Sequence, residues 1–186
     1  MGEQLPIEKL SLARLAKFHD VSDFDCTSKE ECKDLNEFLK NDALKYQERG
    51  FAVTYICTYQ EQIIGFITLC SDSVRIAPKE KEKYFDGIQL TEVPAIKIAR
   101  LGVHKDFQRM GVGRYLVLRA LITARDIKNR IGIRVITVEA KRDSVDYYKE
   151  KLGFLPLEHH NYNSAKREHP YLWIDIFIPE FMNKKA

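Results

Sequence analysis

The segment from Ala95 to Ile127 limits most strongly how this chain can fold. Its first part, 95–103, is rich in β-branched and other apolar side chains, which predicts a β-strand. Apolar residues recur at helical spacing from Leu116 onward, which predicts an amphipathic helix. Gly111 and Gly113 stand between the two and allow a tight turn. A strand that turns directly into such a helix predicts a sheet covered by helices, so the expected class is a mixed α/β sheet.

The rest of the chain adds predicted elements on both sides of this unit. Before it we expect a strand at Ile7 to Leu10, a helix from Glu30 to Arg49, an antiparallel hairpin from Phe51 to Leu69, and a connection with a short helical piece from Pro78 to Pro94. After it we expect a strand from Ile133 to Val138, a helix from Asp143 to Leu152, and a last strand from Tyr171 to Ile178. A chain of 186 residues fits a single domain over residues 1–186.

The composition argues against several classes of protein. No run of about 18 apolar residues occurs, so no membrane-spanning helix and no membrane partner are expected. The first residues lack the apolar stretch of a secretory signal. The four cysteines form no CxxC pair and have no histidines at zinc-ligand spacing, which favours reduced thiols. A cytoplasmic protein without a bound metal is therefore expected.

The glycine turn itself predicts an anion site. The first N–H groups of a helix have no partner within the helix, and together with the helix dipole they favour a bound phosphate. Gly111 and Gly113 would let a pyrophosphate approach the backbone, and Arg109 and Arg114 would add positive charge. No Lys-Ser or Lys-Thr of a P-loop follows, and Leu116 stands where a dinucleotide motif needs its third glycine. The alternative is that the glycines only make a tight turn.

A wider pattern surrounds the turn. Ile98-Ala99-Arg100-Leu101-Gly102-Val103, the glycine turn, a helix, a strand and then Leu152-Gly153-Phe154 together resemble the GNAT superfamily of N-acetyltransferases. The resemblance implies an α/β (α+β) fold: a mixed, mostly antiparallel sheet of six or seven strands flanked by helices, with a V-shaped splay between the two central parallel strands. It also implies acetyl-CoA as the acyl donor. The cofactor-binding residues implied in this way are Leu101, Gly102, Val103, Gln108, Arg109, Met110, Gly111, Val112, Gly113 and Arg114.

The same resemblance implies how catalysis would proceed. An amine would attack the thioester directly in a ternary complex, without a covalent enzyme intermediate. Members of the superfamily place a tyrosine shortly before Leu-Gly-Phe, where it protonates the departing thiolate. An ungapped match puts Lys149 at that position, whereas one extra residue in the last helical turn restores Tyr148, which we take as the predicted acid. Glu139 is the candidate general base and His104 a second candidate; the alternative for each is a solvated side chain.

The amino-terminal half carries a narrower resemblance. Asp23-Phe24-Asp25-Cys26 and Leu35-Asn36-Glu37-Phe38-Leu39 are similar to a GNAT branch that includes toxins of toxin–antitoxin pairs, which acetylate aminoacyl-tRNA. A toxin would need basic surface for tRNA phosphates. The candidates are either Lys128, Arg130 and Arg134 or Lys141 and Arg142, and the alternative is a solvated charged face.

Three functions remain open from the sequence. The first is an N-acetyltransferase that acts on a primary amine of unknown identity. The second is a toxin-like acetyltransferase that acts on aminoacyl-tRNA. The third, motivated by Lys149, is a non-catalytic module that binds acyl-CoA. An edge strand of such a sheet could also pair two copies into a homodimer.

Overall fold

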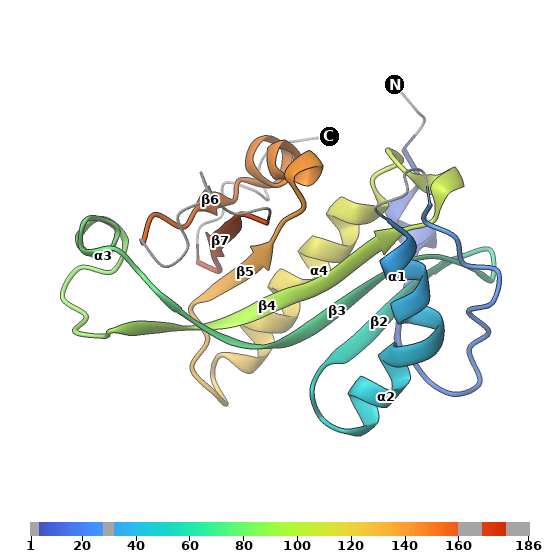
Figure 1. The fold of residues 1–186 in the computed structure, drawn as a ribbon, viewed down its shortest axis with the longest axis horizontal. Helices are drawn as coiled ribbons and strands as arrows, with labels where there is room; N and C mark the ends of the chain where they lie inside the picture. The colour runs from blue at the N-terminus through green and yellow to red at the C-terminus, as the bar shows by residue number, and fades with distance from the viewer. Residues whose placement is uncertain (1–3, 28–31, 160–168, 178–186) are drawn as a thin grey trace. The chain divides into compact units, whose positions relative to one another are not determined.

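The computed structural model of the chain describes residues 4–27, 32–159 and 169–177. Within them the strands form one seven-stranded sheet in the order β1-β2-β3-β4-β5-β7-β6. β4 and β5 run parallel and the other neighbours antiparallel (Figure 1), which confirms the predicted mixed, mostly antiparallel fold class. The strands are β1 (Ser11–Arg14), β2 (Val53–Tyr59), β3 (Gln62–Arg75), β4 (Glu92–Val103), β5 (Val135–Glu139), β6 (Leu155–Pro156) and β7 (Tyr171–Asp175).

Helical segments connect the strands. The α-helices are α1 (Lys33–Glu37), α2 (Ala43–Glu48), α3 (Pro78–Tyr84) and α4 (Val112–Ile127). The 3-10 turns are η1 (Ile7–Lys9), η4 (Lys105–Phe107) and η5 (Arg142–Ser144), and the π-helical turns are η3 (Phe38–Asp42) and η6 (Tyr147–Lys151). Across the described part of the chain, no helix has both the length and the apolar character needed to cross a membrane.

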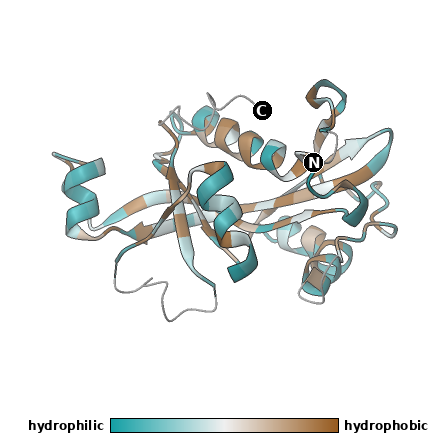
Figure 2. Cartoon of the chain, turned by 90° about the horizontal axis from the view of Figure 1, so that it is seen from above, coloured by the Kyte–Doolittle hydropathy of each residue, from teal (hydrophilic) through white to brown (hydrophobic). Residues whose placement is uncertain are grey.

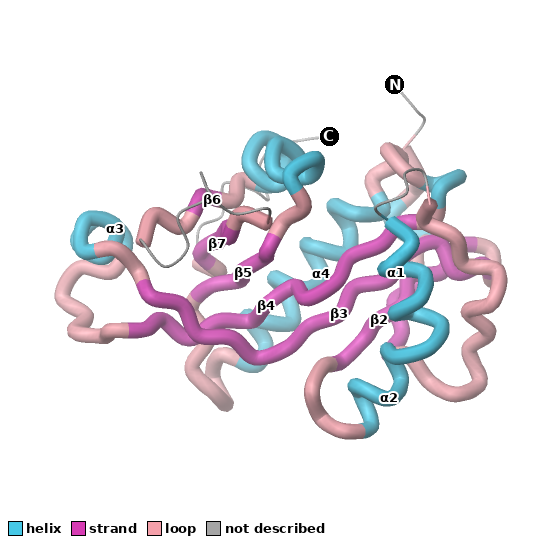
Figure 3. Tube along the Cα trace, in the orientation of Figure 1, coloured by secondary structure: helices cyan, strands magenta, loops and turns pink. Residues whose placement is uncertain are grey.

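Backbone contacts divide the chain into two compact units. The first comprises Met1–Cys70 and Ile98–Ala120, and the second comprises Ser71–Lys97 and Leu121–Ala186. β3 and β4 are the two longest strands (Figure 3). Both strands, and the helix α4, contribute residues to each of the two units. The single domain over residues 1–186 stays a prediction.

In the first unit, the β2–β3 hairpin is packed on both faces. Gln60 and Glu61 both have positive φ (48° and 67°), as a two-residue type I′ turn requires, so the predicted hairpin is confirmed. Neighbouring Gly65 and Phe66 of β3 point to opposite faces. A Cβ on Gly65 would lie 3.0 Å from a methyl carbon of Val112, so the start of α4 packs closely against this strand.

The opposite face of the hairpin is covered by one helical stretch, 33–48, made of α1, η3 and α2. The buried side chains where this stretch meets the two strands are Phe38, Leu39, Ala43, Ile56 and Phe66. The predicted helix is thus confirmed from Lys33 onward, while residues 30 and 31 lie outside the described residues. Its apolar residues recur at helical spacing because they share this buried side.

The second unit has its own apolar core on one face of its strands. Its buried members are Val74, Ile76, Phe85, Val93, Ala95, Val135, Leu157, Tyr171 and Trp173. Tyr84 and Phe85, at the end of α3, pack on the buried indole of Trp173 with ring centroids 5.1 and 5.6 Å away. Figure 2 shows the rest of α3 as hydrophilic, so this end of the helix is the part that joins the core.

Several predicted boundaries are wrong for local reasons. Residues 7–10 form the 3-10 turn η1, closed by a hydrogen bond from the Lys9 N–H to the Pro6 carbonyl oxygen (3.0 Å), and β1 begins only at Ser11. The predicted helix over 143–152 contains a 3-10 turn and a π turn in place of a regular α-helix. β6 is too short to leave a pattern in the sequence. β7 ends at Asp175, and residue 178 lies outside the described residues.

Candidate active site

The turn between β4 and α4 lies wholly in the first unit. Arg109 and Gly111 have positive φ (64° and 89°), and these left-handed residues redirect the chain before the helix begins. The N–H of Tyr115 donates to the Gly111 carbonyl oxygen (3.0 Å), four residues earlier. The N–H groups of Val112 and Gly113 therefore lie in the first turn of α4, ahead of this helical hydrogen bond. With the positive end of a 16-residue helix behind them, these groups suit a bound phosphate.

The two glycines of the turn serve different purposes. Gly111 has a φ that L side chains rarely adopt, and a Cβ there would meet only Gln4 Oε1, at 4.0 Å. Gly113 lies in the first turn of α4, where any residue except proline can adopt the backbone conformation at modest cost. Backbone conformation therefore explains Gly111, whereas close approach of an anion remains the predicted reason for Gly113.

The segment before the turn is tied to the amino-terminal part of the chain. The Gln108 side-chain amide donates to the carbonyl oxygens of Val103 and Cys26, both at 3.1 Å. The Lys105 N–H donates to the Asp25 carbonyl oxygen (2.8 Å), and its ammonium group donates to Asp25 Oδ2 (3.0 Å). These contacts fix the base of the turn.

Asn36 on α1 extends this support to the helical stretch. Its amide donates to Asp25 Oδ1 (2.9 Å) and Thr27 Oγ1 (2.7 Å), and its side-chain oxygen accepts from the Cys26 N–H (2.9 Å). The Thr27 N–H, with Lys105 and Asn36, holds the pKa of the Asp25 carboxyl well below its usual range. We call Asp25, Cys26, Thr27, Asn36 and Lys105 the Asn36 latch. The amino-terminal motif of the sequence thus supports the turn predicted to bind the cofactor.

The three residues predicted to meet the pantetheine arm end β4 in the same unit. Gly102 is buried, and a Cβ there would stand only 2.5 Å from the Phe66 ring, so packing alone already requires a glycine. Leu101 and Val103 are half-buried. The Val103 carbonyl oxygen accepts from Gln108, so this part of the backbone takes part in fixing the turn.

His104 is a buried capping residue, with only 5% of its surface exposed. Its Nδ1 accepts from the Asp106 N–H (3.3 Å), and its ring lies against Phe24 and Phe107. The alternative interpretation of His104, a solvated side chain, is therefore wrong, and its role as a base stays a prediction. The imidazole is shielded from solvent because the amino-terminal segment folds over it.

Glu139, the candidate general base, ends β5 in the second unit. Its Oε2 lies 3.0 Å from Lys97 Nζ, and 37% of its side chain is exposed, against 23% for Lys97. The side chain is therefore not an isolated carboxylate in solvent. Lys97 also lies 4.7 Å from the centroid of the Tyr171 ring.

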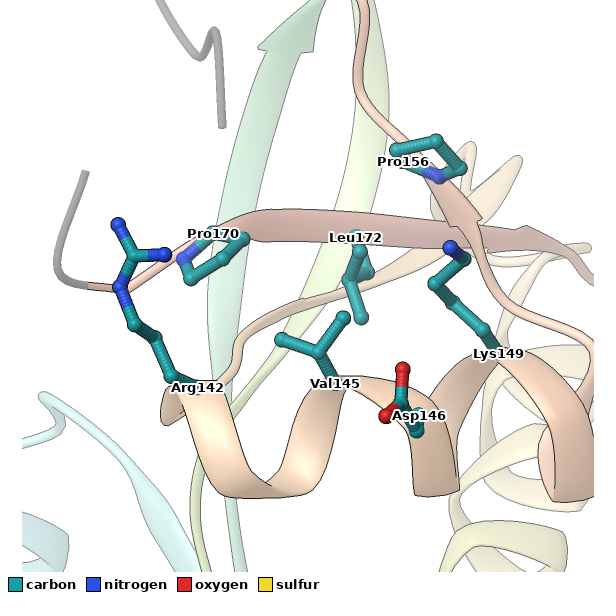
Figure 4. A pocket seen from close by; sticks show the side chains of 7 residues that line it. All are labelled: Arg142, Val145, Asp146, Lys149, Pro156, Pro170 and Leu172. Atoms are coloured by element: carbon teal, nitrogen blue, oxygen red, sulfur yellow. The ribbon is translucent and has the colours of Figure 1, made fainter. Parts of the chain in front are cut away.

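Tyr148 and Lys149, the alternative acids, have opposite environments in the second unit. Tyr148 is buried, its ring centroid is 5.2 Å from that of Phe154, and burial raises the pKa of its phenol above the usual range. Lys149 is exposed and lines a hollow of about 340 Å³. Figure 4 shows its side chain extending toward Pro156. Both residues belong to the π turn η6.

Among the basic residues proposed for tRNA, Arg134 has a structural role. Its guanidinium donates to the buried Asp175 carboxylate (2.5 Å) and lies over the rings of Phe85 and Phe177. Lys128 also lies over the Phe177 ring, at 5.5 Å. Arg134 therefore stabilises the second unit, because removing it would leave a buried carboxylate without this partner.

Two of the four cysteines, Cys26 and Cys57, do not resemble nucleophiles. All four are free thiols, and Cys26 and Cys57 are buried. Burial raises the pKa of both thiols to about 12, so neither forms a thiolate at neutral pH. This agrees with a direct transfer that needs no covalent intermediate.

The fold and the turn together define a class of protein. A mostly antiparallel sheet with one parallel pair, in which the first parallel strand runs through a glycine turn into a helix, is the arrangement of the N-acetyltransferases. The profile of the Acetyltransferase (GNAT) family matches residues 16–154, and the chain belongs to this family. It is an acetyltransferase by this membership.

One similar protein is a tRNA-acetylating toxin, and another is complexed with an acetylated tRNA. The tRNA-acetylating toxin of Mycobacterium tuberculosis (strain ATCC 25618 / H37Rv) is 26% identical over 132 residues, which is 70% of this chain and 75% of the toxin. The structure of AtaT complexed with acetyl-methionyl-tRNAfMet is 25% identical, with a TM-score of 0.73 over 89% of this chain and 94% of that one. A mutant AtaT bound to acetyl-CoA and the C-terminus of the antitoxin AtaR shares the fold, with 23% identity and a TM-score of 0.71 over 95% of this chain and 99% of that one.

Proposed function

We propose that this chain transfers an acetyl group from acetyl-CoA to the amino group of an aminoacyl-tRNA. The proposal is carried by the turn at Arg109–Gly113 in a chain of the GNAT family. This turn presents the first N–H groups of a helix, and it contains Gly113, a glycine that the backbone conformation does not require. The acceptor is inferred from the relatives: AtaT is complexed with acetyl-methionyl-tRNA, and the mycobacterial protein is a tRNA-acetylating toxin.

The residues proposed to hold acetyl-CoA fit its chemistry. The N–H groups at the start of α4 and the positive charges of Arg109 and Arg114 suit a pyrophosphate. Gly113 has no side chain that would keep an anion from the backbone, and the Asn36 latch holds the base of the turn. The backbone of Leu101–Val103 would pair with the pantetheine amides. Acetyl-CoA supplies the activated thioester, and the chain supplies position and electrostatic stabilisation.

Tyr148 is the proposed acid for the departing thiolate. In an α-helix each N–H donates to the carbonyl oxygen four residues earlier, whereas in a π-helical turn it donates to the one five residues earlier. A π turn therefore contains one additional residue. The π turn at Tyr147–Lys151 therefore accommodates the extra residue that is needed to match Tyr148 with the family's tyrosine. A phenol of ordinary pKa, about 10, is already protonated at neutral pH, as an acid must be, and burial raises the pKa of Tyr148 further. Lys149 instead lies in the exposed hollow.

Partners follow from the same comparison. AtaT binds the C-terminus of the antitoxin AtaR, so we propose that a small antitoxin protein also binds this chain. A cytoplasmic location would give it access to charged tRNA. Pairing of two copies through an edge strand is part of this proposal and is tested by the molar mass in solution.

The experiment uses the purified chain, labelled acetyl-CoA and a pool of charged tRNAs. We expect acetylated aminoacyl-tRNA, and calorimetry should detect acetyl-CoA binding that weakens at least about tenfold in Gly113→Val, because a side chain there keeps the anion from the helix N–H groups. Gly132→Ala is the matched control, since a Cβ at Gly132 meets nothing within 4 Å.

Two results would contradict the proposal. If calorimetry detects no heat when acetyl-CoA is added to the wild-type chain, acetyl-CoA is not the cofactor and the proposed transfer reaction is ruled out. Binding of acetyl-CoA without any acetylated tRNA would remove the acceptor and leave a different amine as the substrate.

A further inference from the structure

Four strands of the second unit bring charged and hydroxyl side chains together beside Glu139. Lys97 Nζ lies 3.0 Å from Glu139 Oε2 and 4.7 Å from the centroid of the Tyr171 ring. The Tyr171 hydroxyl donates to Asp72 Oδ2 (3.2 Å), and the Thr137 hydroxyl donates to the same oxygen (2.6 Å). We call these five residues, Asp72, Lys97, Thr137, Glu139 and Tyr171, the Glu139 cluster.

The cluster occupies a face of the sheet that is otherwise apolar. Glu139 pairs with Tyr171 and Thr137 with Trp173 in the β5–β7 register, so these side chains share one face. Two residues before Thr137 on β5, Val135 belongs to the apolar core of the unit. Thr137 and Tyr171 are buried, and burying polar groups costs stability even when they are paired, so apolar side chains would be favourable at these two positions. Such a local departure from the pattern is typical of a functional site.

The charges of the cluster suit one kind of ligand. Asp72 and Glu139 are acidic and Lys97 is basic. Partial burial opposes the charge on Lys97, but hydrogen bonds to Tyr171 and Glu139 outweigh this and raise the pKa of its ammonium group, which stays cationic. The cluster therefore carries one net negative charge, which a single primary ammonium group would neutralise.

We propose that the Glu139 cluster receives the ammonium group of the acceptor and selects acceptors whose neighbouring carboxyl group is esterified or amidated. This inference rests on the proposed function. An amino acid esterified to tRNA presents an ammonium group and no carboxylate, and so complements the net negative charge. A free amino acid brings its own carboxylate within a few ångströms of Asp72 and Glu139, and the like charges repel it.

The cluster also accounts for the protons of the reaction. Asp72 already accepts hydrogen bonds from the Thr137 hydroxyl, the Tyr171 hydroxyl and the Ser73 N–H. Glu139 is the more exposed of the two acids, so it is the one that can exchange a proton with solvent. Glu139 takes one proton from the ammonium group and passes it to solvent. The neutral amine attacks the thioester carbon, the C–N bond forms, and the C–S bond breaks with its electron pair on sulfur. The nitrogen loses a second proton, which balances the proton that Tyr148 gives to the thiolate.

In this scheme Glu139 is a catalytic residue, and Lys97 is a positioning residue that acts through it. Loss of the Lys97 ammonium would leave Glu139 without its 3.0 Å partner and change the net charge of the cluster from one to two negative charges. Its removal should therefore change the pH profile of kcat as well as KM. A residue that only stabilised the fold would change neither.

The test compares two small acceptors as competitive inhibitors of tRNA acetylation: the methyl ester and the free form of the amino acid found on the acetylated tRNA. We expect the ester to inhibit at least about tenfold more strongly in the wild-type chain, because Asp72 and Glu139 repel the carboxylate of the free amino acid. Asp72→Asn should weaken ester inhibition and reduce this preference. Glu139→Gln should lower kcat and shift its pH profile, and Lys97→Met should shift the profile as well.

Glu92→Gln is the matched control. Glu92 of β4 forms an ion pair with Arg75 of β3 at 3.1 Å in the same unit, outside the cluster, and we expect no change in kinetics. Equal inhibition by the ester and the free amino acid would refute the selectivity. Cluster variants that behave like Glu92→Gln while tRNA is still acetylated would refute the cluster and leave the proposed function intact. If acetyl-CoA binds but no charged tRNA is acetylated, the proposed function fails, and methionine methyl ester against methionine as acceptors then tests the cluster in the same variants.

Discussion

Replacing Asn36 with alanine tests whether the amino-terminal motif controls cofactor binding. The Asn36 side chain lies on α1, outside the glycine turn, and holds Asp25, Cys26 and Thr27 through four hydrogen bonds of 2.7 to 3.0 Å. Asp25 and Cys26 in turn accept from Lys105 and Gln108. Asn36→Ala should therefore loosen the turn without removing any group that could contact acetyl-CoA.

The size of the effect follows from these contacts. Three of the four hydrogen bonds are to neutral groups, the Cys26 N–H, the Cys26 thiol and the Thr27 hydroxyl, and each contributes about 1 kcal/mol net. Their loss should lower the free energy of unfolding by about 2–3 kcal/mol. If about half of this free energy is expressed as disorder of the turn, only the ordered fraction binds, and the Kd of acetyl-CoA rises by up to about tenfold.

Calorimetry with acetyl-CoA gives the Kd, and urea unfolding of the same preparation gives the stability. Asn41→Ala is the matched control, because Asn41 is exposed in the same helical stretch and makes one hydrogen bond, to Glu37 (3.2 Å). It should change neither quantity measurably. A destabilised Asn36→Ala chain that is still folded and binds acetyl-CoA as tightly as wild type would refute the link between the latch and the turn.

Three further substitutions test other parts of the structure. Tyr148→Phe should lower kcat by about a hundredfold, the usual contribution of a general acid, with the Kd of acetyl-CoA unchanged, whereas Lys149→Met should change kcat by less than about threefold in the same steady-state assay. Gly102→Ala should destabilise the chain by about 1–3 kcal/mol in urea, because its Cβ would stand 2.5 Å from the Phe66 ring; a neutral effect would contradict that packing. The folded-state pKa of Asp25 is lowered, so its contribution is present above its ordinary pKa of 3.8 and is lost as pH falls below it. Asp25→Asn should therefore reduce the slope of stability against pH in that acid range, and an unchanged slope would show that other carboxylates cause it.

Local patterns predicted much of the fold. The hairpin of β2 and β3 could be predicted because both strands are rich in β-branched and aromatic residues and only two polar residues separate them. The helix after Gly113 could be predicted because one face of α4 is buried along its length, including Leu116, Ala120 and Ala124. In both elements, the side chains that are buried in the structure are apolar and recur at regular spacing in the sequence.

The surroundings of His104 could not be predicted in this way. The sequence places Lys105 and Asp106 next to it, and these polar neighbours suggest a solvated loop. The His104 ring is covered by Phe24, 80 positions earlier in the chain. The backbone N–H of His104 donates to the carbonyl oxygen of Ile64 on β3 (2.8 Å). Contacts between such distant residues leave no local period. The polar Asn36 within an otherwise apolar helical face was a usable signal, because a half-buried amide needs partners.

The alternatives at Tyr148 and Lys149 show why helix geometry limits matches between sequences. A match counted back from Gly153 assumes a regular helical turn, and the sequence contains nothing that states how many residues each turn holds. Gly153 has positive φ (73°) and ends the segment, and the Phe154 N–H donates to the carbonyl oxygen of Tyr148, six residues earlier (2.9 Å). In a helix end of the Schellman type, the corresponding N–H donates to a carbonyl oxygen only five residues earlier. The additional residue therefore lies between Tyr148 and Gly153, and this position is the one that the proposal of Tyr148 as the acid requires.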